Sequence, residues 1–462
     1  MLSHLRRERG FYKRVWALSL PLILQNLITT SLGFVDTFMV GLLGQTELSA
    51  VTAANSPVFL LQVIVFGLIS GLTILVSQYW GKGDTDSINR CMGVAMYAGL
   101  LLAGTVSLVM FFFPEPVMRL VTNNETLVTL GAPYLQIVGI GYIFNACSSV
   151  YVGAQRSTEN PVMGMVVFAV SMLLNTFLNY CLIFGHFGAP AMGITGAAVA
   201  TFLSRVVEFL LTLLYALTNK RIPLKFGLLL RPGKAIFRSF VRYATPVLFN
   251  ETFWGLGTTM MTVIMGHMLI SEEMLAAYAI MGNIDKFATV ACFGLAGAAA
   301  VIVGKYIGEG RPQDEVYSVS WCLLLVSVGV GLAVSLTMAV LLPTAFIPYL
   351  YPLFHLEGLS LEIAITMCVV YLFFVPLKAF DITNITGVLR AGGDSRMAAI
   401  MDVGPLWAVA VPFTALCGLV FDAPIFLICI ALYSESICKV PWGIQRMRSR
   451  KWINDVTRGT TT

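Results

Sequence analysis

The chain has 462 residues, of which 57% are hydrophobic and 11% are charged, and its formal net charge is +5. Soluble globular proteins carry about 25% charged residues, so this composition excludes an ordinary soluble protein. In lipid, only helices and closed barrels satisfy every backbone polar group internally. The apolar runs far exceed the ~10-residue alternating segments of barrel strands, and we therefore predict an all-α integral membrane protein.

Twelve apolar stretches are long enough to cross a bilayer, which takes roughly 20 residues. The first begins at Val15 and is too long for the apolar region of a cleaved signal peptide, so we expect it to be a retained first span. The predicted spans are 15–41, 48–78, 89–113, 127–152, 161–185, 192–217, 239–268, 274–304, 316–342, 362–389, 396–419 and 423–445.

Basic residues gather in every second predicted loop, which indicates the cytoplasmic side of a membrane. They fill the amino terminus (1–14), the central linker (218–238) and the tail (446–462), and Arg390 and Lys439 belong to the same pattern. We therefore predict a multi-pass protein of the plasma (inner) membrane with both termini in the cytoplasm. The positive charge reports orientation, and we expect the lipid bilayer, rather than nucleic acid, as the partner.

The two halves of the chain repeat one another. Pro21 and Pro246 are 225 residues apart, as are Gly41 and Gly266. Further matches are Phe66-Gly67-Leu68 with Phe293-Gly294-Leu295, and Gly153-x-x-Arg156 with Gly387-x-x-Arg390. We predict an N-lobe of six spans (15–217) and a C-lobe of six spans (239–445). An even number of spans per half makes them parallel repeats, one of the repeat types found in transporters.

Ionisable groups inside spans are costly and usually functional. Two of the predicted span carboxylates have local partners, since Arg205 precedes Glu208 by three residues and Glu435 precedes Lys439 by four. Seven carboxylates within the predicted spans are candidates for a functional role: Asp36, Glu208, Glu251, Asp285, Asp381, Asp402 and Glu435.

Asp36 has no basic neighbour on its own helix. A carboxylate removed from water can take up a proton, and with other oxygens nearby it can hold a hard cation instead. Asn175 and Asn179 share a helical face and each offers an amide oxygen. A coupling role for these residues stands beside a structural one, because amides also join helices in membranes.

The predicted C-lobe spans hold more acids than bases. Lys378 lies one turn from Asp381, so we expect either a plain Lys378–Asp381 pair or a built-in counter-ion that competes with the substrate. Lys286 is expected to meet a carboxylate of another span, and Asp402 is a further cavity candidate. The acid excess favours cationic cargo. A cluster of adaptable side chains could contact it or simply face lipid or core: Phe253, Trp254, Met260 and Met261.

These features resemble the multidrug and toxic-compound extrusion (MATE) family over essentially the whole chain. The resemblance rests on Pro21, Val35-Asp36-Thr37 with Gly41, the Gly-x-Gly ends of the second and eighth spans, and Arg390-Ala-Gly-Gly-Asp394. It implies a V-shaped, two-lobe transporter that exports bulky organic compounds, often cations, driven by inward flow of Na⁺ or H⁺. Apart from that ion it implies no cofactor or metal, and we expect a monomer.

The resemblance also implies residue roles. In the N-lobe it places Asn175, Asn179 and a sixth-span Thr, which Thr201 supplies, opposite Asp36, and it makes Pro21 a bending point. Some members carry a second Asp where this chain has Asn179, which leaves Na⁺ and H⁺ both open. In the C-lobe it assigns a cation site to a seventh-span Glu and a tenth-span Asp, for which Glu251 and Asp381 are the counterparts.

Other classes of function remain as alternatives. A lipid-linked oligosaccharide flippase of the same superfamily would need a basic cavity for pyrophosphate, whereas acids predominate here. A small-solute symporter is compatible with the sequence. An enzyme is not favoured, because no Walker-A motif, H-E-x-x-H motif or nucleophile elbow is found. A channel would need pore-lining rings from an oligomer.

Overall fold

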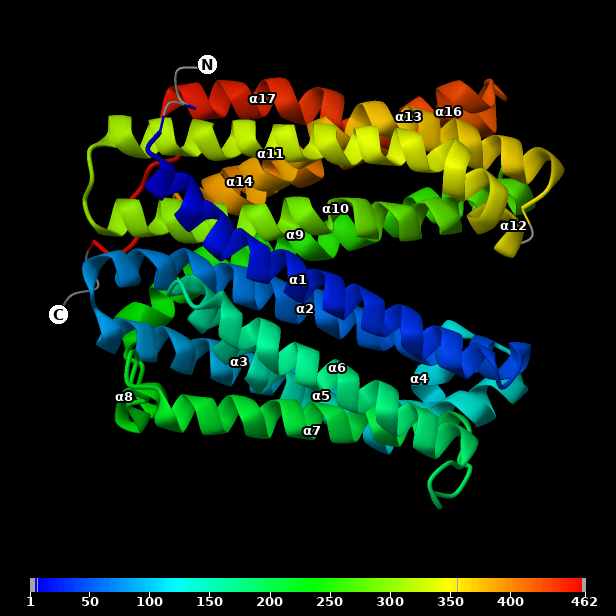
Figure 1. Ribbon diagram of the computed structural model, residues 1–462. Helices are drawn as coiled ribbons and strands as arrows, with labels where there is room; N and C mark the ends of the chain where they lie inside the picture. Colours follow the sequence, from blue (N-terminus) through cyan, green and yellow to red (C-terminus); the bar gives the residue numbers. More distant parts are fainter. Residues whose placement is uncertain (1–4, 6, 355, 459–462) are drawn as a thin grey trace. The chain divides into compact units, whose positions relative to one another are not determined.

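The computed structural model describes residues 5, 7–354 and 356–458, and every regular element in them is helical (Figure 1). Eleven helices of this part of the chain are long and apolar enough to cross a membrane. The helix α9 (Lys234–Gly266) is a further long one, with Arg238 and Arg242 near its start and Glu251 in its middle. Together they match the twelve predicted spans and confirm the all-α fold class.

The first half contains six long helices. They are α1 (Arg9–Gly41), α2 (Gln45–Lys82), α3 (Thr85–Phe112), α5 (Glu125–Ser157), α6 (Pro161–Phe184) and α7 (Ile194–Thr218), with the short α4 (Pro114–Val121) and α8 (Phe226–Leu230) between them and before α9.

The second half is more often interrupted by π-helical turns. After α9 come α10 (Ser271–Gly308), α11 (Gln313–Leu341), α12 (Tyr351–Leu353), α13 (Gly358–Ile382), α14 (Ser395–Pro405), α15 (Val411–Ala415), α16 (Ile425–Tyr433) and α17 (Glu435–Ser449). The π segments are η2 (Leu342–Leu350), η3 (Thr383–Leu389), η4 (Leu406–Ala410) and η5 (Leu416–Val420).

The repeat seen in the sequence recurs in the helices. Both α1 and α9 have 33 residues, and their ends lie 225 positions apart, the offset that separates Pro21 from Pro246. The helices that follow, α2 and α10, both have 38 residues. Equal lengths at nearly the same offset, 225 positions for α1 and α9 and 226 for α2 and α10, show that the halves are built on one plan.

The chain forms two compact units whose boundaries fall inside helices. One unit comprises Met1–Ile23 and Thr245–Val456, and the other comprises Leu24–Ala244 and Thr457–Thr462. The boundaries lie within α1, just after Pro21, and within α9, just before Pro246. A proline inside a helix removes a backbone hydrogen bond and permits a bend. Each half therefore begins with a helix that starts in one unit and ends in the other.

Glycines let the starting segments of α1 and α9 pack closely in their units. A Cβ on Gly294 of α10 would lie 2.4 Å from Ile23 Cγ1 and 2.8 Å from the Ile23 backbone nitrogen. A Cβ on Gly71 of α2 would lie 2.7 Å from Ala244 Cα. Gly294 is the central residue of the repeated Phe-Gly-Leu motif, so close backbone contact explains the motif in the second half.

The Arg390-Ala-Gly-Gly-Asp394 motif is covered by the segment that follows α17. Trp452 is fully buried, and a Cβ on Gly392 would lie 2.4 Å from the Trp452 carbonyl oxygen. Gly393 has a φ of +79°, a conformation that favours glycine. The Asn454 backbone N–H also donates to the Gly392 carbonyl at 2.9 Å. Part of the predicted free tail (446–462) is thus packed into its unit.

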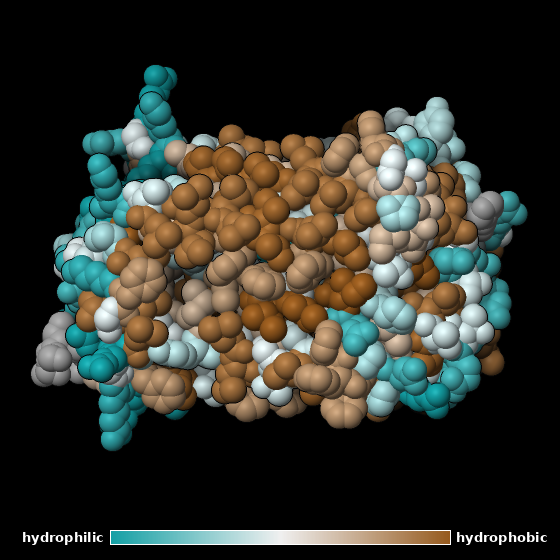
Figure 2. Space-filling view, turned by 90° about the horizontal axis from the view of Figure 1, so that it is seen from below, coloured by the Kyte–Doolittle hydropathy of each residue, from teal (hydrophilic) through white to brown (hydrophobic). Residues whose placement is uncertain are grey.

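The exposed surface carries the hydrophobicity expected of a lipid-facing protein. Figure 2 shows a face that is hydrophobic over its middle, with hydrophilic side chains gathered at two opposite ends. Large exposed apolar side chains include Leu101, Leu173 and Leu214, which are 71%, 69% and 62% exposed. An apolar surface this extensive indicates lipid contact rather than water.

We expect Gly294→Ala to destabilise the protein, because the added methyl group overlaps the backbone of Ile23. Overpacking of this kind costs about 1–3 kcal/mol. Gly282→Ala on the same helix is the matched control, since no atom lies within 4 Å of its added Cβ. Thermal unfolding of the purified protein in detergent should show a lower midpoint for Gly294→Ala only. Equal midpoints for the two variants would contradict the close contact.

Candidate functional site

Five of the seven predicted span carboxylates form ion pairs within the described residues. The predicted Arg205–Glu208 pair is confirmed at 2.7 Å, and so is Lys439–Glu435 at 3.0 Å. The other paired acids are Glu251, Asp285 and Asp402. Two acids, Asp36 in one unit and Asp381 in the other, form no ion pair with any described residue.

Asp36 stands at one end of a chain of hydrogen bonds that joins three helices of its unit. The Asn179 amide of α6 donates to Asp36 Oδ1 of α1 at 2.6 Å and to Asn175 Oδ1 at 3.1 Å. The Asn175 amide in turn donates to the Thr201 hydroxyl of α7 at 3.4 Å. The structure therefore brings together the four polar residues that the sequence predicted for the N-lobe.

This arrangement gathers carboxylate, amide and hydroxyl oxygens that have few hydrogen-bond donors among the described residues. Asn175 and Asn179 are 2% and 1% exposed, and the buried Oδ1 atom of Asn179 accepts no hydrogen bond from a described residue. Carboxylate, amide and hydroxyl oxygens are the ligands that hard cations use. The carboxylate alone can accept a proton. The geometry is therefore compatible with a proton or a small cation.

The buried Glu208 serves a structural role in the same unit. Besides Arg205, it accepts a hydrogen bond from the Asn145 amide at 3.0 Å and from the Ser171 hydroxyl at 3.4 Å. With these partners the charge of Glu208 is offset on several sides. It ties α5, α6 and α7 together.

In the other unit Glu251 pairs with Arg390 at 2.8 Å, and the guanidinium is almost completely buried. The sequence analysis counted Arg390 as a cytoplasmic loop charge. Arg390 does lie in the turn that directly follows η3, but its side chain is buried and paired with Glu251 of α9, which the sequence did not reveal. Only the three-dimensional structure shows this partner, because the two residues are 139 positions apart.

Lys439 is a second cation that the sequence analysis misplaced at the surface. It is only 4% exposed, and it donates to Asp402 Oδ1 at 2.8 Å. The second oxygen of Asp402 accepts from the Asn250 amide at 2.9 Å. The four-residue spacing identified Glu435 as one partner of Lys439, but it gave no sign of Asp402. A buried ammonium thus links α14 with α17.

Asp381 is placed differently from the predicted plain pair with Lys378. It is 7% exposed, lies within electrostatic range of Lys439, and its buried Oδ2 atom has no hydrogen-bond partner among the described residues. Glu251 and Asp381 do not share a direct contact. Asp381 thus remains a buried acid without an ion pair.

Lys378 pairs instead with Asp285 of α10, at 2.5 Å, and the Tyr371 hydroxyl donates to the same Asp285 oxygen. The expectation that Lys286 meets a carboxylate was also wrong, since Lys286 is exposed and forms no ion pair within the described part of the chain. The cross-span partner of Asp285 comes from α13.

The predicted apolar contact residues divide into two groups. Phe253, Trp254 and Met260 are 44%, 38% and 38% exposed, so they remain available to a ligand or to lipid. Met261 is 3% exposed and belongs to a hydrophobic core cluster. Its burial favours the alternative of a core residue.

The comparisons with known proteins agree with the observed repeat and fold. The MatE family model matches residues 21–181 and 246–416, two stretches that begin at the repeated prolines. The uncharacterized transporter YisQ of Bacillus subtilis is 24% identical over 95% of this chain and 94% of its own length. The multidrug resistance protein PmpM of Pseudomonas aeruginosa is 26% identical over 89% of this chain and 85% of its own.

A solved structure of similar fold is an outward-facing multidrug resistance MATE family transporter of the MOP superfamily. It has a TM-score of 0.84 and 19% sequence identity, and the match covers 97% of this chain and 98% of that one. The fold, with two units whose boundaries fall inside α1 and α9, is that of a polytopic membrane transporter. The chain belongs to the MatE family, and the predicted resemblance is confirmed.

We expect Arg390→Met to destabilise its unit, because it leaves Glu251 buried without its partner. Breaking a buried ion pair costs about 3–5 kcal/mol. Adding Glu251→Gln to the same protein should restore much of the loss, since no isolated charge then remains. A double-mutant cycle on thermal unfolding in detergent measures the coupling. Additive effects of the two substitutions would show that the pair does not interact.

Proposed function

We propose that this protein is a secondary active multidrug exporter that moves organic cations out of the cell in exchange for H⁺ or Na⁺ by alternating access. It would work in the plasma (inner) membrane with both termini in the cytoplasm, as a monomer and without another cofactor. The observation that carries the proposal is Asp36, a carboxylate that accepts a hydrogen bond from Asn179 and forms no ion pair with any described residue. The name of PmpM, a multidrug resistance protein, supports the cargo class.

An isolated carboxylate in a protein interior is unfavourable, because removal from water costs several kcal/mol per ion. A proton or a small cation relieves that cost, and an exchangeable one can be traded for a cationic substrate. Asp36 meets this requirement, since its one close partner is a neutral amide. Asn175, Asn179 and Thr201 orient it and add oxygen ligands.

Asp381 is the corresponding candidate in the other unit. It too lacks an ion pair, but it lies near the ammonium of Lys439. That ammonium already offsets part of the charge in the C-lobe cluster, so we assign the principal coupling role to Asp36. Glu251 and Asp402 carry their own built-in cations, and we assign them a supporting role.

The charge balance favours cations over the anionic cargo of a flippase. Four of the cations inside the spans or at their ends, Arg205, Lys378, Arg390 and Lys439, have a carboxylate partner, whereas Lys286 forms no ion pair within the described residues. A pyrophosphate group would have to displace one of these carboxylates. The acids without ion pairs attract positive charge instead.

We expect Asp36→Asn to abolish gradient-driven export of a cationic dye, because the amide can neither take up a proton nor offer a negative charge. Efflux from energised vesicles is measured under a Na⁺ gradient and a proton gradient separately, beside Asp381→Asn. Glu125→Gln is the matched control, since that exposed acid pairs with Arg119 at the surface. Export should fall at least about tenfold for Asp36→Asn, the range that loss of one essential interaction commonly gives.

Full dye export by Asp36→Asn would contradict the assignment of the coupling site. If the unaltered protein moves no cationic dye under either gradient, the exporter proposal fails. Uptake of a small solute would then favour a symporter, and movement of an anionic lipid-linked sugar would favour a flippase.

A further inference from the structure

The Asp285–Lys378 pair is the most accessible of the ion pairs that involve the span carboxylates. The side chains of Asp285 and Lys378 are 33% and 22% exposed. The corresponding values are 13% and 3% for Glu251 and Arg390, and 19% and 5% for Asp402 and Lys439. A ligand can reach an ion pair only where the charged groups are exposed, so the Asp285–Lys378 pair is more accessible to a ligand than the buried pairs.

One half of the Asp285 carboxylate is available. The Tyr371 hydroxyl and the Lys378 ammonium both donate to Oδ1. These donors are seven residues apart, two turns along one face of α13. No described residue donates to Oδ2. Asp285 is therefore held in place by one oxygen and can accept a further positive group at the other.

The surroundings match the chemistry that recognises an organic cation. The Lys378 ammonium lies 5.2 Å from the centroid of the Tyr371 ring, within the range of cation–π attraction. The Tyr433 ring lies 5.3 Å from Tyr371 and 5.7 Å from Phe374. A positive group in this position contacts a carboxylate and an aromatic face at once. Lys378 occupies it now.

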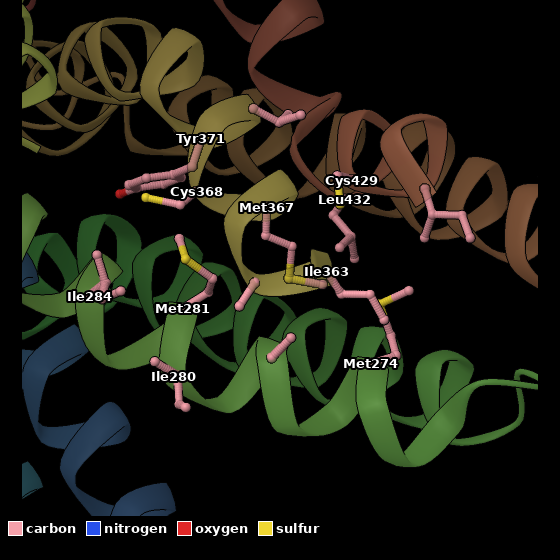
Figure 3. Packing of buried hydrophobic residues seen from close by; sticks show 14 of the residues in the cluster. Met274, Ile280, Met281, Ile284, Ile363, Met367, Cys368, Tyr371, Cys429 and Leu432 are labelled. Carbon is pink, nitrogen blue, oxygen red and sulfur yellow. The ribbon is translucent and has the colours of Figure 1, made fainter. Parts of the chain in front are cut away.

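The site borders a core rich in methionine. Figure 3 shows Tyr371 of α13 beside Cys368, with Met281 and Ile284 of α10 facing the same helix. Met367 and Met274 extend this cluster along the two helices. These methionines are buried, so they pack α10 against α13 next to the ion pair, and the exposed part of the site is the pair itself.

We infer that Asp285 is a binding site for the positive group of an amphipathic organic cation, and that Lys378 is a tethered competitor for it. This inference rests on the proposed cationic cargo. A tethered group has a high effective concentration, so it weakens ligand binding and returns to Asp285 when the ligand leaves. The carboxylate therefore never stays uncompensated, and Tyr371 keeps it in position throughout the exchange.

The test is equilibrium binding of tetraphenylphosphonium to the purified full-length protein in detergent, with tetraphenylborate as an anion of the same shape. Lys378→Met should tighten tetraphenylphosphonium binding by about tenfold, because the competitor is gone. Asp285→Asn should weaken it by a similar factor. Lys286→Met is the matched control, since it removes a neighbouring positive charge that forms no ion pair in the described chain. Tetraphenylborate should bind Lys378→Met no more tightly than the unaltered protein.

Equal gains for both probes in Lys378→Met would mean a wider apolar space rather than a cation site, and would overturn the inference. Unchanged binding in both Asp285→Asn and Lys378→Met would also overturn it. Lys378→Arg keeps the competitor and should bind tetraphenylphosphonium like the unaltered protein, which separates competition from misfolding. Binding is measured without any gradient, so a failure of export in vesicles leaves this result intact.

Discussion

The cost of a charge in a low-dielectric interior governs both the packing and the chemistry of this protein. Taking an ion out of water costs several kcal/mol unless a partner offsets it. Three of the seven span carboxylates draw that partner from another segment: Glu251 of α9 from Arg390, Asp402 of α14 from Lys439 of α17, and Asp285 of α10 from Lys378 of α13. These ion pairs therefore also fix how the helices of one unit pack.

The two span carboxylates that form no ion pair with a described residue are the ones that can exchange a cation. Asp36 has an amide as its close partner, and Asp381 has a buried oxygen that forms no hydrogen bond with a described residue. A carboxylate in such a place needs a cation from outside, and an outside cation can be exchanged. The same requirement ties an exporter's driving ion to its cationic cargo. At Asp285 the tethered Lys378 meets the requirement from within, at the most exposed of the ion pairs that the described span carboxylates form.

Features set by local spacing were predictable from the sequence, and those set by tertiary contact were not. The long apolar helices follow from run length, the repeat from residues at matching offsets, and the Asn175–Asn179 face from helical spacing, and the structure shows all three. Lys378 was assigned to Asp381 because they are one turn apart. The structure gives it to Asp285, a residue 93 positions away that sequence spacing cannot reveal. Arg390 and Lys439 look like cytoplasmic charges in the sequence because their partners Glu251 and Asp402 lie far away along the chain.

The most direct measurement counts the coupling cations that leave the purified protein when a cationic ligand binds. Tetraphenylphosphonium is titrated into protein in weakly buffered detergent while released protons, or radioactive Na⁺ preloaded on the protein, are recorded. We expect the unaltered protein to release cations, Asp36→Asn to release about one fewer per chain, and Glu125→Gln to match the unaltered protein. The same release from Asp36→Asn and Asp381→Asn as from the unaltered protein would show that neither carboxylate holds the exchangeable cation.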